Sequence, residues 1–206
     1  MVWSITAVIV SYLLGSVSFS FLLGKMMKGI DIRDHGSGNA GATNTLRTLG
    51  KWPAILVLAL DIAKGIAAVW IGRSLGGDSA WVPALCGISA IIGHNWPVFF
   101  RFRGGKGIAT AIGVLATLCF LPALYAGIIA ILSIFITRYV SLGSLIFVFL
   151  TPLFLLILLY PWPVFWSSLI ICIFAFWRHR TNIMKLIQGK ENKIGSSSAK
   201  GGNRVV

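Results

Sequence analysis

Residues 107–137 read GIATAIGVLATLCFLPALYAGIIAILSIFIT and carry no charged side chain, although Lys106 precedes them and Arg138 follows them. An α-helix needs roughly 20 apolar residues to cross the hydrocarbon core of a bilayer. These 31 residues are therefore long for one crossing and short for two. Because basic residues collect in cytoplasmic loops, a cation at each end indicates two crossings that return the chain to the same side.

The rest of the chain repeats this alternation of apolar runs and basic segments. The chain is 57% hydrophobic and 11% charged, whereas soluble proteins carry about 25% charged residues. Its mean hydropathy of +0.88 agrees with this composition. We therefore predict an integral membrane protein whose apolar residues face lipid as well as each other.

Basic residues gather in four parts of the chain. They occupy residues 25–51, residues 100–106, Arg138, and the stretch 178–193. If all four parts face the cytoplasm, an even number of crossings separates each from the next. The N-terminus then lies outside and the C-terminus in the cytoplasm, with Arg73 as the loop cation left outside.

This parity sets the number of helices. One helix comes from 2–24, and two each come from 52–99, 107–137 and 142–178. Proline disrupts a helix interior, so Pro122 and the segment 160–163 mark the breaks inside the two longest runs. The predicted fold class is an all-α membrane protein of seven transmembrane helices, several of them short. A re-entrant pair within 107–137 is the alternative.

The predicted domain covers residues 1–193 as one seven-helix unit with its active-site loops in the cytoplasm. Residues 194–206 are rich in Gly and Ser, so we expect a disordered tail or a vector-derived remnant. The net charge of +13 is explained mainly by topology, and no nucleic-acid partner is expected. The cysteines, histidines and acidic residues are dispersed, so neither a metal site nor a cofactor is predicted.

The first basic segment is too rich in small and hydrogen-bonding residues to be a simple linker. Glycines in it permit positive φ and a close approach of backbone to a ligand, and Arg47 supplies a planar cation suited to phosphate. Consecutive backbone N–H groups in such a loop can form an anion-binding nest. The candidate site residues here are Gly36, Ser37, Gly38, Asn39, Thr43, Asn44 and Arg47, and Gly41 is a third glycine that permits positive φ.

A second candidate is the Gly104-Gly105-Lys106-Gly107 loop. It opens directly into an expected helix, whose free N–H groups and dipole favour an anion. The loop is not a Walker A motif, because Gly107 stands where that motif needs a hydroxyl for Mg²⁺. ATP hydrolysis is therefore not expected.

The last two basic segments again pair cations with hydroxyl or amide groups. They add Ser141, Ser144, His179 and Asn182 to the candidate site. A plain interfacial histidine is the competing interpretation of His179. His35 and His94 are weaker candidates, and we interpret Asp61 and Lys64 as a structural ion pair that steadies a neighbouring loop.

Four cytoplasmic loops with phosphate-suited groups are most simply explained by one site where they converge. Such a site beside lipid suits a reaction that joins a phosphorylated polar molecule to an acyl chain. A transporter of a phosphorylated solute is the alternative, although transporters place their sites near the bilayer midplane. A non-catalytic membrane anchor is a third class, and it would not need four such loops.

Two long motifs resemble the PlsY family of bacterial glycerol-3-phosphate acyltransferases. They are Ser37-Gly-Asn-Ala-Gly-Ala-Thr-Asn44 and Gly93-His94…Pro97…Phe102-Arg103-Gly-Gly-Lys-Gly107, and the segments 141–144 and 179–183 agree with them. The resemblance implies a seven-helix enzyme of the bacterial cytoplasmic (inner) membrane, with its active site at the cytoplasmic face. It implies acyl transfer from acyl phosphate to the 1-hydroxyl of glycerol 3-phosphate, the first acylation of bacterial phospholipid synthesis.

A mechanism follows as a hypothesis. Lys106, His179, Ser37 and Arg47 are the expected catalytic residues. The first loop and Lys106 would hold the acyl phosphate, whereas Arg47, Ser144, His179 and Asn182 would hold glycerol 3-phosphate. The assignment of the two phosphates, the acyl-chain preference and the general base stay open. The base is either the leaving phosphate or His179. The expected partners are the lipid bilayer and these two substrates, and a seven-helix bundle could act as a monomer.

Overall fold

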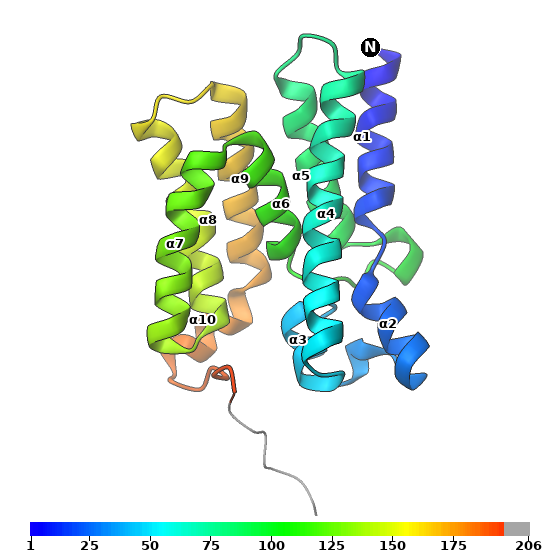
Figure 1. Ribbon diagram of the computed structural model, residues 1–206, viewed down its shortest axis with the longest axis vertical. Helices are drawn as coiled ribbons and strands as arrows, with labels where there is room; N and C mark the ends of the chain where they lie inside the picture. Colours follow the sequence, from blue (N-terminus) through cyan, green and yellow to red (C-terminus); the bar gives the residue numbers. More distant parts are fainter. Residues whose placement is uncertain (196–206) are drawn as a thin grey trace, which may run out of the picture.

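The computed structural model describes residues 1–195, and every regular element in that range is a helix (Figure 1). In chain order these are α1 (Val2–Gly15), α2 (Phe19–Lys28), η1 (Ile32–Asp34), α3 (Ala42–Thr48), α4 (Lys51–Leu75), α5 (Trp81–Asn95), η2 (Val98–Phe100), α6 (Ile108–Leu118), α7 (Phe120–Thr137), α8 (Val140–Ile157), α9 (Trp162–Arg178) and α10 (Arg180–Ile187). The predicted all-α class is confirmed. The expected tail lies outside the described residues from 196 onward.

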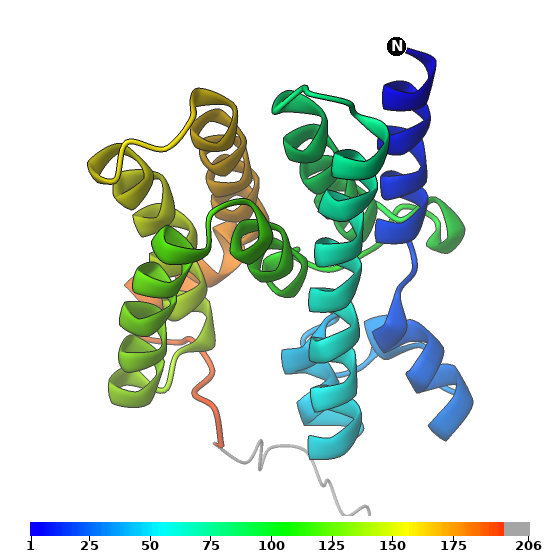
Figure 2. The same ribbon diagram turned by 45° about the horizontal axis from the view of Figure 1, so that its top comes forward.

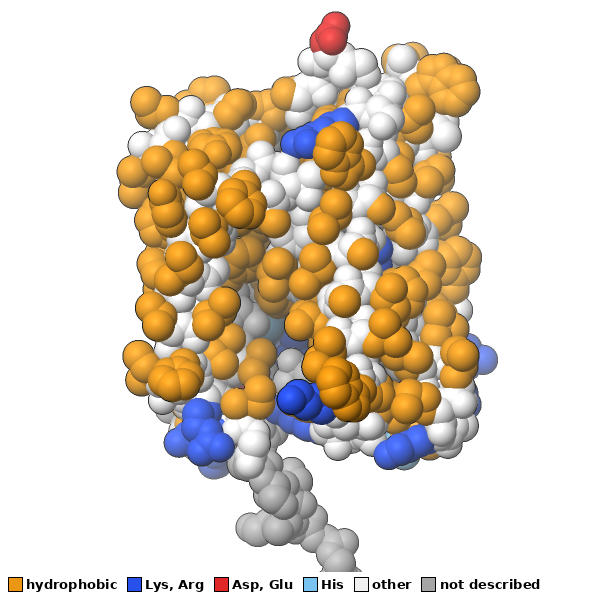
Figure 3. All heavy atoms as spheres, in the orientation of Figure 1, with side chains coloured by type: hydrophobic (Ala, Val, Ile, Leu, Met, Phe, Trp, Pro, Cys, Tyr) orange, Lys and Arg blue, Asp and Glu red, His pale blue; other side chains and the backbone are white. Residues whose placement is uncertain are grey.

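Among residues 1–195, five helical segments are long and apolar enough to cross a bilayer. They are Val2–Lys28, Lys51–Leu75, Trp81–Phe100, Phe120–Thr137 and Val140–Ile157. Two further apolar helices, α6 and α9, are shorter. The surface agrees with this assignment, since hydrophobic side chains cover most of the face shown in Figure 3 and blue Lys and Arg side chains gather near one end.

The first apolar run differs from its prediction as one helix over residues 2–24. It breaks between α1 and α2 at Ser16–Ser18. The Val17 carbonyl accepts a hydrogen bond from the Lys64 ammonium of α4 at 2.8 Å, so the chain at this break is held by a neighbouring helix. Lys64 also lies 2.8 Å from Asp61, and both side chains are buried. The predicted Asp61–Lys64 ion pair is present, and Lys64 also contacts the chain at this break.

The proline breaks fall where they were predicted. Residues 107–137 divide at Cys119 into α6 and α7, and Pro122 lies in the first turn of α7. Pro161 precedes α9, whose first turn contains Pro163. A proline in the first turn of a helix has no hydrogen bond to lose, so each proline begins a helix here instead of interrupting one.

The helices form two groups with α6 between them, as Figures 1 and 2 both show. One group contains α1, α4 and α5, and the other contains α7, α8 and α9. Glycine permits the close packing of α1 on α5, because a Cβ at Gly15 or Gly93 would overlap the backbone of the other helix. A buried apolar cluster runs through α5, α6, α8 and α9 and joins the two groups.

Candidate active site

A cavity of about 790 Å³ lies between the two helix groups and collects most of the predicted site residues. The hollow is visible between α7 and α4 in Figure 3. The predicted residues that line it are Ser37, Asn39, Thr43, Asn44, Arg47, Lys106, Gly107, Ser141, Ser144, His179 and Asn182. Four predicted glycines, Gly36, Gly38, Gly104 and Gly105, do not line it.

Asn44 holds the first loop in shape with its own side chain. Its Oδ1 accepts the Ser37 N–H at 2.8 Å, and its Nδ2 donates to the carbonyls of Ile32 and His35, each at 3.0 Å. The side chain is fully buried. Asn44 thus has no amide hydrogen left for a ligand, and we assign it to positioning Ser37.

Glycine conformation in this loop was predicted in part. Gly36 and Gly38 have φ of +62° and +72°, as expected of residues that side chains would strain. Gly41 does not use this conformational freedom, because its φ of −162° is extended. Gly41 instead begins α3, and its carbonyl accepts the N–H groups of Asn44 and Thr45.

Gly104 and Gly105 position the lysine that follows them. The Gly105 N–H donates to the His94 carbonyl at 3.1 Å. The Arg178 guanidinium of α9 donates to the carbonyls of both glycines, at 3.3 Å to Gly104 and 2.6 Å to Gly105. A Cβ at either glycine would overlap the His94 backbone or ring, so both positions require glycine.

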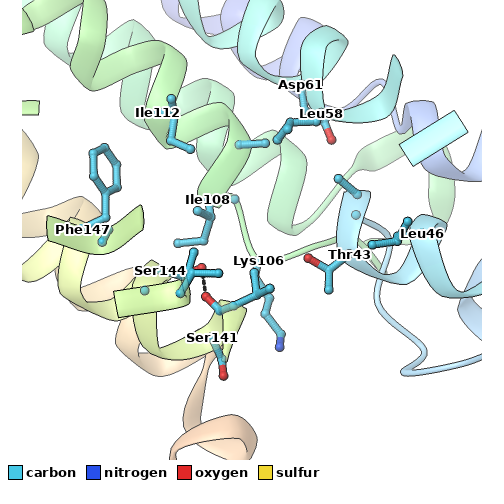
Figure 4. Close-up of a pocket in the computed structure, with 18 of the residues that line it drawn as sticks. Thr43, Leu46, Leu58, Asp61, Lys106, Ile108, Ile112, Ser141, Ser144 and Phe147 are labelled. Atoms are coloured by element: carbon cyan, nitrogen blue, oxygen red, sulfur yellow. Dashed lines mark hydrogen bonds between the residues drawn. The ribbon is translucent and has the colours of Figure 1, made fainter. Parts of the chain in front are cut away.

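Lys106 extends into the polar end of the cavity, between Thr43 on one side and Ser141 and Ser144 of α8 on the other (Figure 4). Its ammonium donates to the Oδ1 of Asn182. The Ser141 hydroxyl is buried without a hydrogen-bond partner among residues 1–195, whereas that of Ser144 donates to the Val140 carbonyl at 2.8 Å. Cationic and hydroxyl groups from three parts of the chain therefore meet at one place.

Burial lowers the pKa of two residues here. It lowers the pKa of Lys106 to about 8, with nearby cations adding to the shift and Glu191 opposing it. Burial and the Lys106 charge lower the pKa of His179 to about 4. The Nδ1 of His179 lies 2.8 Å from the Ala175 carbonyl, which can only accept. His179 is therefore neutral at pH 7, with the proton on Nδ1 and a free lone pair on Nε2.

These pKa values predict the pH dependence of the site for an anionic substrate. Lys106 binds an anion only while protonated, so kcat/KM should fall as the pH rises through about 8. His179 stays neutral throughout that range and adds no change of its own. A pH profile of kcat/KM from about pH 6 to 10 measures the effect, and Lys106→Arg should remove the alkaline decline because arginine stays charged. A decline that persists in Lys106→Arg would assign it to another group.

The opposite part of the cavity is apolar. Side chains of α4, α6 and α7 line it, including Leu58, Ile112, Leu124, Ile128 and Ile131. The polar end and this apolar wall belong to one continuous cavity, so a ligand with a phosphate and a long hydrocarbon chain fits both.

Comparison with known proteins agrees with this geometry. The family model described as glycerol-3-phosphate acyltransferase matches residues 5–189. The chain belongs to the glycerol-3-phosphate acyltransferase family. It is 58% identical to the glycerol-3-phosphate acyltransferase of Shouchella clausii, over 95% of this chain and 98% of that protein. It is also 58% identical to the enzyme of Halalkalibacterium halodurans, over 91% and 94%.

Solved structures support the same assignment. The acyltransferase fold superposes on the crystal structure of PlsY, an integral membrane glycerol 3-phosphate acyltransferase, in its glycerol 3-phosphate form with a TM-score of 0.88 at 41% identity. That match covers 93% of this chain and 96% of the other. The lysophosphatidic acid form of PlsY gives a TM-score of 0.85 at 40% identity. The enzyme class, and with it the exclusion of the transporter and anchor alternatives, is established.

Several residues outside the main predicted set also line the cavity of this acyltransferase, among them His94, which was a weaker candidate. Asp61 and His94 reach it from α4 and α5, with the His94 Nδ1 3.5 Å from the Asp61 carboxylate. Glu191 and Ile194 reach it from the segment after α10. No motif marks Glu191, since a single acid in a polar stretch near the chain end has no pattern around it. Arg178 was predicted only as part of a basic segment, and its hydrogen bonds to two glycine carbonyls depend on folding.

Proposed function

We propose that this acyltransferase moves an acyl group from acyl phosphate to the 1-hydroxyl of sn-glycerol 3-phosphate. The products are 1-acylglycerol 3-phosphate and inorganic phosphate. The observation that supports this proposal most is the single cavity that joins a cationic, hydroxyl-rich end to a long apolar wall. An acyl phosphate needs both parts at once, with its phosphate at Lys106 and its chain against α7.

The two phosphates divide the polar end between them. The acyl phosphate is held by Ser37, Asn39 and Thr43 of the first loop, together with Lys106 and the N-terminus of α6 at Gly107. Glycerol 3-phosphate is held by Arg47, Ser144, His179 and Asn182. Lys106 lies between the two sets, so its charge stabilises both phosphates and the negative charge that develops on the acyl carbonyl.

The chemical step needs no covalent enzyme intermediate. The 1-hydroxyl oxygen forms a bond to the acyl carbon, and the bond between that carbon and the phosphate oxygen breaks. The hydroxyl proton passes to the departing phosphate, whose second pKa is near 6. Positioning of the two substrates supplies a large share of the acceleration. His179, with a free lone pair on Nε2, accepts a hydrogen bond from the 2-hydroxyl of glycerol 3-phosphate and orients the substrate.

Substitution of His179 separates these roles. A base with a pKa of about 4 removes a hydroxyl proton poorly at pH 7, so His179→Gln should raise the KM for glycerol 3-phosphate and leave kcat largely recovered at saturation. Steady-state kinetics over a wide range of glycerol 3-phosphate concentration measure both constants. A kcat that stays about 10²-fold lower at saturation would instead make His179 the general base.

The membrane topology is part of the proposal. We place seven crossings at the α1–α2 segment, α4, α5, α6, α7, α8 and α9, with the N-terminus outside the cytoplasmic membrane and the active site at its cytoplasmic face. The alternation of helix directions and the basic segments 25–51 and 178–193 support this orientation. Cysteine labelling from each side of the membrane, at positions in these segments and at Asp78, measures it. The protein is proposed to act as a monomer, because residues of one chain supply the whole site.

One assay tests the reaction. The purified protein in detergent, given acyl phosphate and glycerol 3-phosphate, should release inorganic phosphate and form lysophosphatidic acid in equal amounts. Replacing acyl phosphate by acyl-CoA or by acyl carrier protein should give no product. Product formed only from one of these thioesters would overturn the proposed donor while leaving the acceptor in place.

A further inference from the structure

The segment that follows α10, residues 188–195, brings a carboxylate to the phosphate-binding end of the cavity. Glu191 and Ile194 line the cavity, and the Ile194 N–H donates to the Arg138 carbonyl at 2.8 Å, which fixes the segment against the start of α8. Both proposed substrates are phosphates. An acidic side chain at this position repels them, since like charges at short range raise the energy of binding.

Glu191 accepts a hydrogen bond from Asn182, a residue that we propose binds a substrate phosphate. The Asn182 Nδ2 donates to the Glu191 Oε1 at 2.8 Å, while the Oδ1 of the same amide accepts from Lys106. In this arrangement one of the two amide N–H groups is directed to Glu191, and the lysine donates to the same amide. Two groups that the proposed function gives to a phosphate, the Lys106 ammonium and the Asn182 amide, thus make hydrogen bonds within the protein.

The contact between Glu191 and Asn182 leaves one carboxylate oxygen without a partner, so a bound phosphate can replace it. The second carboxylate oxygen of Glu191, Oε2, is buried and has no hydrogen-bond partner in the described part of the chain. A buried acceptor without a partner destabilises the state that contains it, and more so when it is charged. A phosphate dianion carries more charge than a carboxylate and offers three acceptor oxygens, so it competes well for Lys106 and Asn182.

We propose that Glu191 is an internal competitor of the substrate phosphate, whose carboxylate accepts from Asn182 in the free enzyme and leaves when glycerol 3-phosphate binds. The inference rests on the proposed function, since it takes the second substrate phosphate to lie at Asn182. The free energy needed to displace Glu191 therefore opposes binding, and the dissociation constant of glycerol 3-phosphate is higher than it would be without this carboxylate.

The test is Glu191→Gln, which keeps the shape of the side chain and removes its charge. The dissociation constants of glycerol 3-phosphate and of inorganic phosphate, measured by calorimetry on the full chain, should each fall about tenfold, equivalent to about 1.4 kcal/mol. The kcat should stay within about twofold, because the carboxylate has left the site before the chemical step. Asp78→Asn is the matched control, since it makes the same charge change at an exposed loop position remote from the cavity and should alter neither constant.

Equal or weaker binding in Glu191→Gln would overturn the inference, because it would show that the carboxylate orients Asn182 for the substrate. A tenfold gain in Asp78→Asn as well would also overturn it, by assigning the effect to net charge. If the proposed function itself is wrong, the experiment gives a different result. In that case the wild-type protein forms no lysophosphatidic acid from acyl phosphate, whatever the ratio of the two dissociation constants.

Discussion

Lys106→Met should lower kcat/KM for acyl transfer by about 10³-fold or more. Removal of one preorganised donor to a developing oxyanion typically lowers kcat about 10²-fold to 10³-fold, and we propose that this lysine also binds the substrate phosphates. Methionine is similar in length and apolar, so it fills the same space without the charge. Initial rates of phosphate release at varied concentrations of both substrates give kcat and each KM.

Two further measurements show whether the loss of activity in Lys106→Met comes from the missing charge and not from a change in folding. Lys106→Arg keeps the cation and should retain more activity than Lys106→Met, although the planar guanidinium does not reproduce the contact with Asn182. The thermal midpoint should change little in both variants, since the glycines and Arg178 set the loop conformation. Activity within about tenfold of the wild type in Lys106→Met would remove this residue from the catalytic group.

Gly127→Phe should shorten the acyl chains that the enzyme accepts. Gly127 lines the cavity on α7, and nothing lies within 4 Å of a Cβ built there, so a larger side chain would extend into the space left for the substrate. Each methylene excluded from an apolar environment loses about 0.8 kcal/mol. A phenyl ring that displaces about four methylenes should therefore lower kcat/KM for long-chain acyl phosphates about 10²-fold.

Short chains supply the comparison. An acyl phosphate that ends before Gly127 should react with Gly127→Phe at nearly the wild-type rate. Ile129→Phe is the matched control, because Ile129 is exposed on α7 and does not line the cavity. Removal of glycine from a helix interior should not destabilise the fold. An equal loss for long and short chains would show that the chain does not follow this wall.

The fold was largely predictable because membrane crossing leaves a strong pattern in sequence. Runs of apolar residues between cations gave the helices, and proline gave the breaks at Cys119 and Pro161. The break between α1 and α2 was missed, since residues 2–24 contain neither a charged residue nor a proline. It depends on the contact of the Val17 carbonyl with Lys64, which lies 47 residues away in the chain.

The candidate site was predictable as a set of residues but not as a set of roles. Loops rich in Gly, Ser, Asn and cations signal anion binding, and most of their polar residues do reach one cavity. Sequence spacing does not say which side chain faces the ligand and which supports the loop. Asn44, Gly104 and Gly105 turned out to face the protein. Glu191 carried no signal at all, because its importance comes from the packing of the chain end against Arg138.

The hollow between α4 and α7 has a consequence for how the reaction proceeds in one direction. Its apolar wall opens on a face covered with hydrophobic side chains, whereas its polar end meets the basic loops (Figure 3). In the proposed reaction, one product is the lipid lysophosphatidic acid and the other is water-soluble inorganic phosphate. They partition into different phases by separate exits, bilayer for one and water for the other, so the pair is seldom together at the site to react backward.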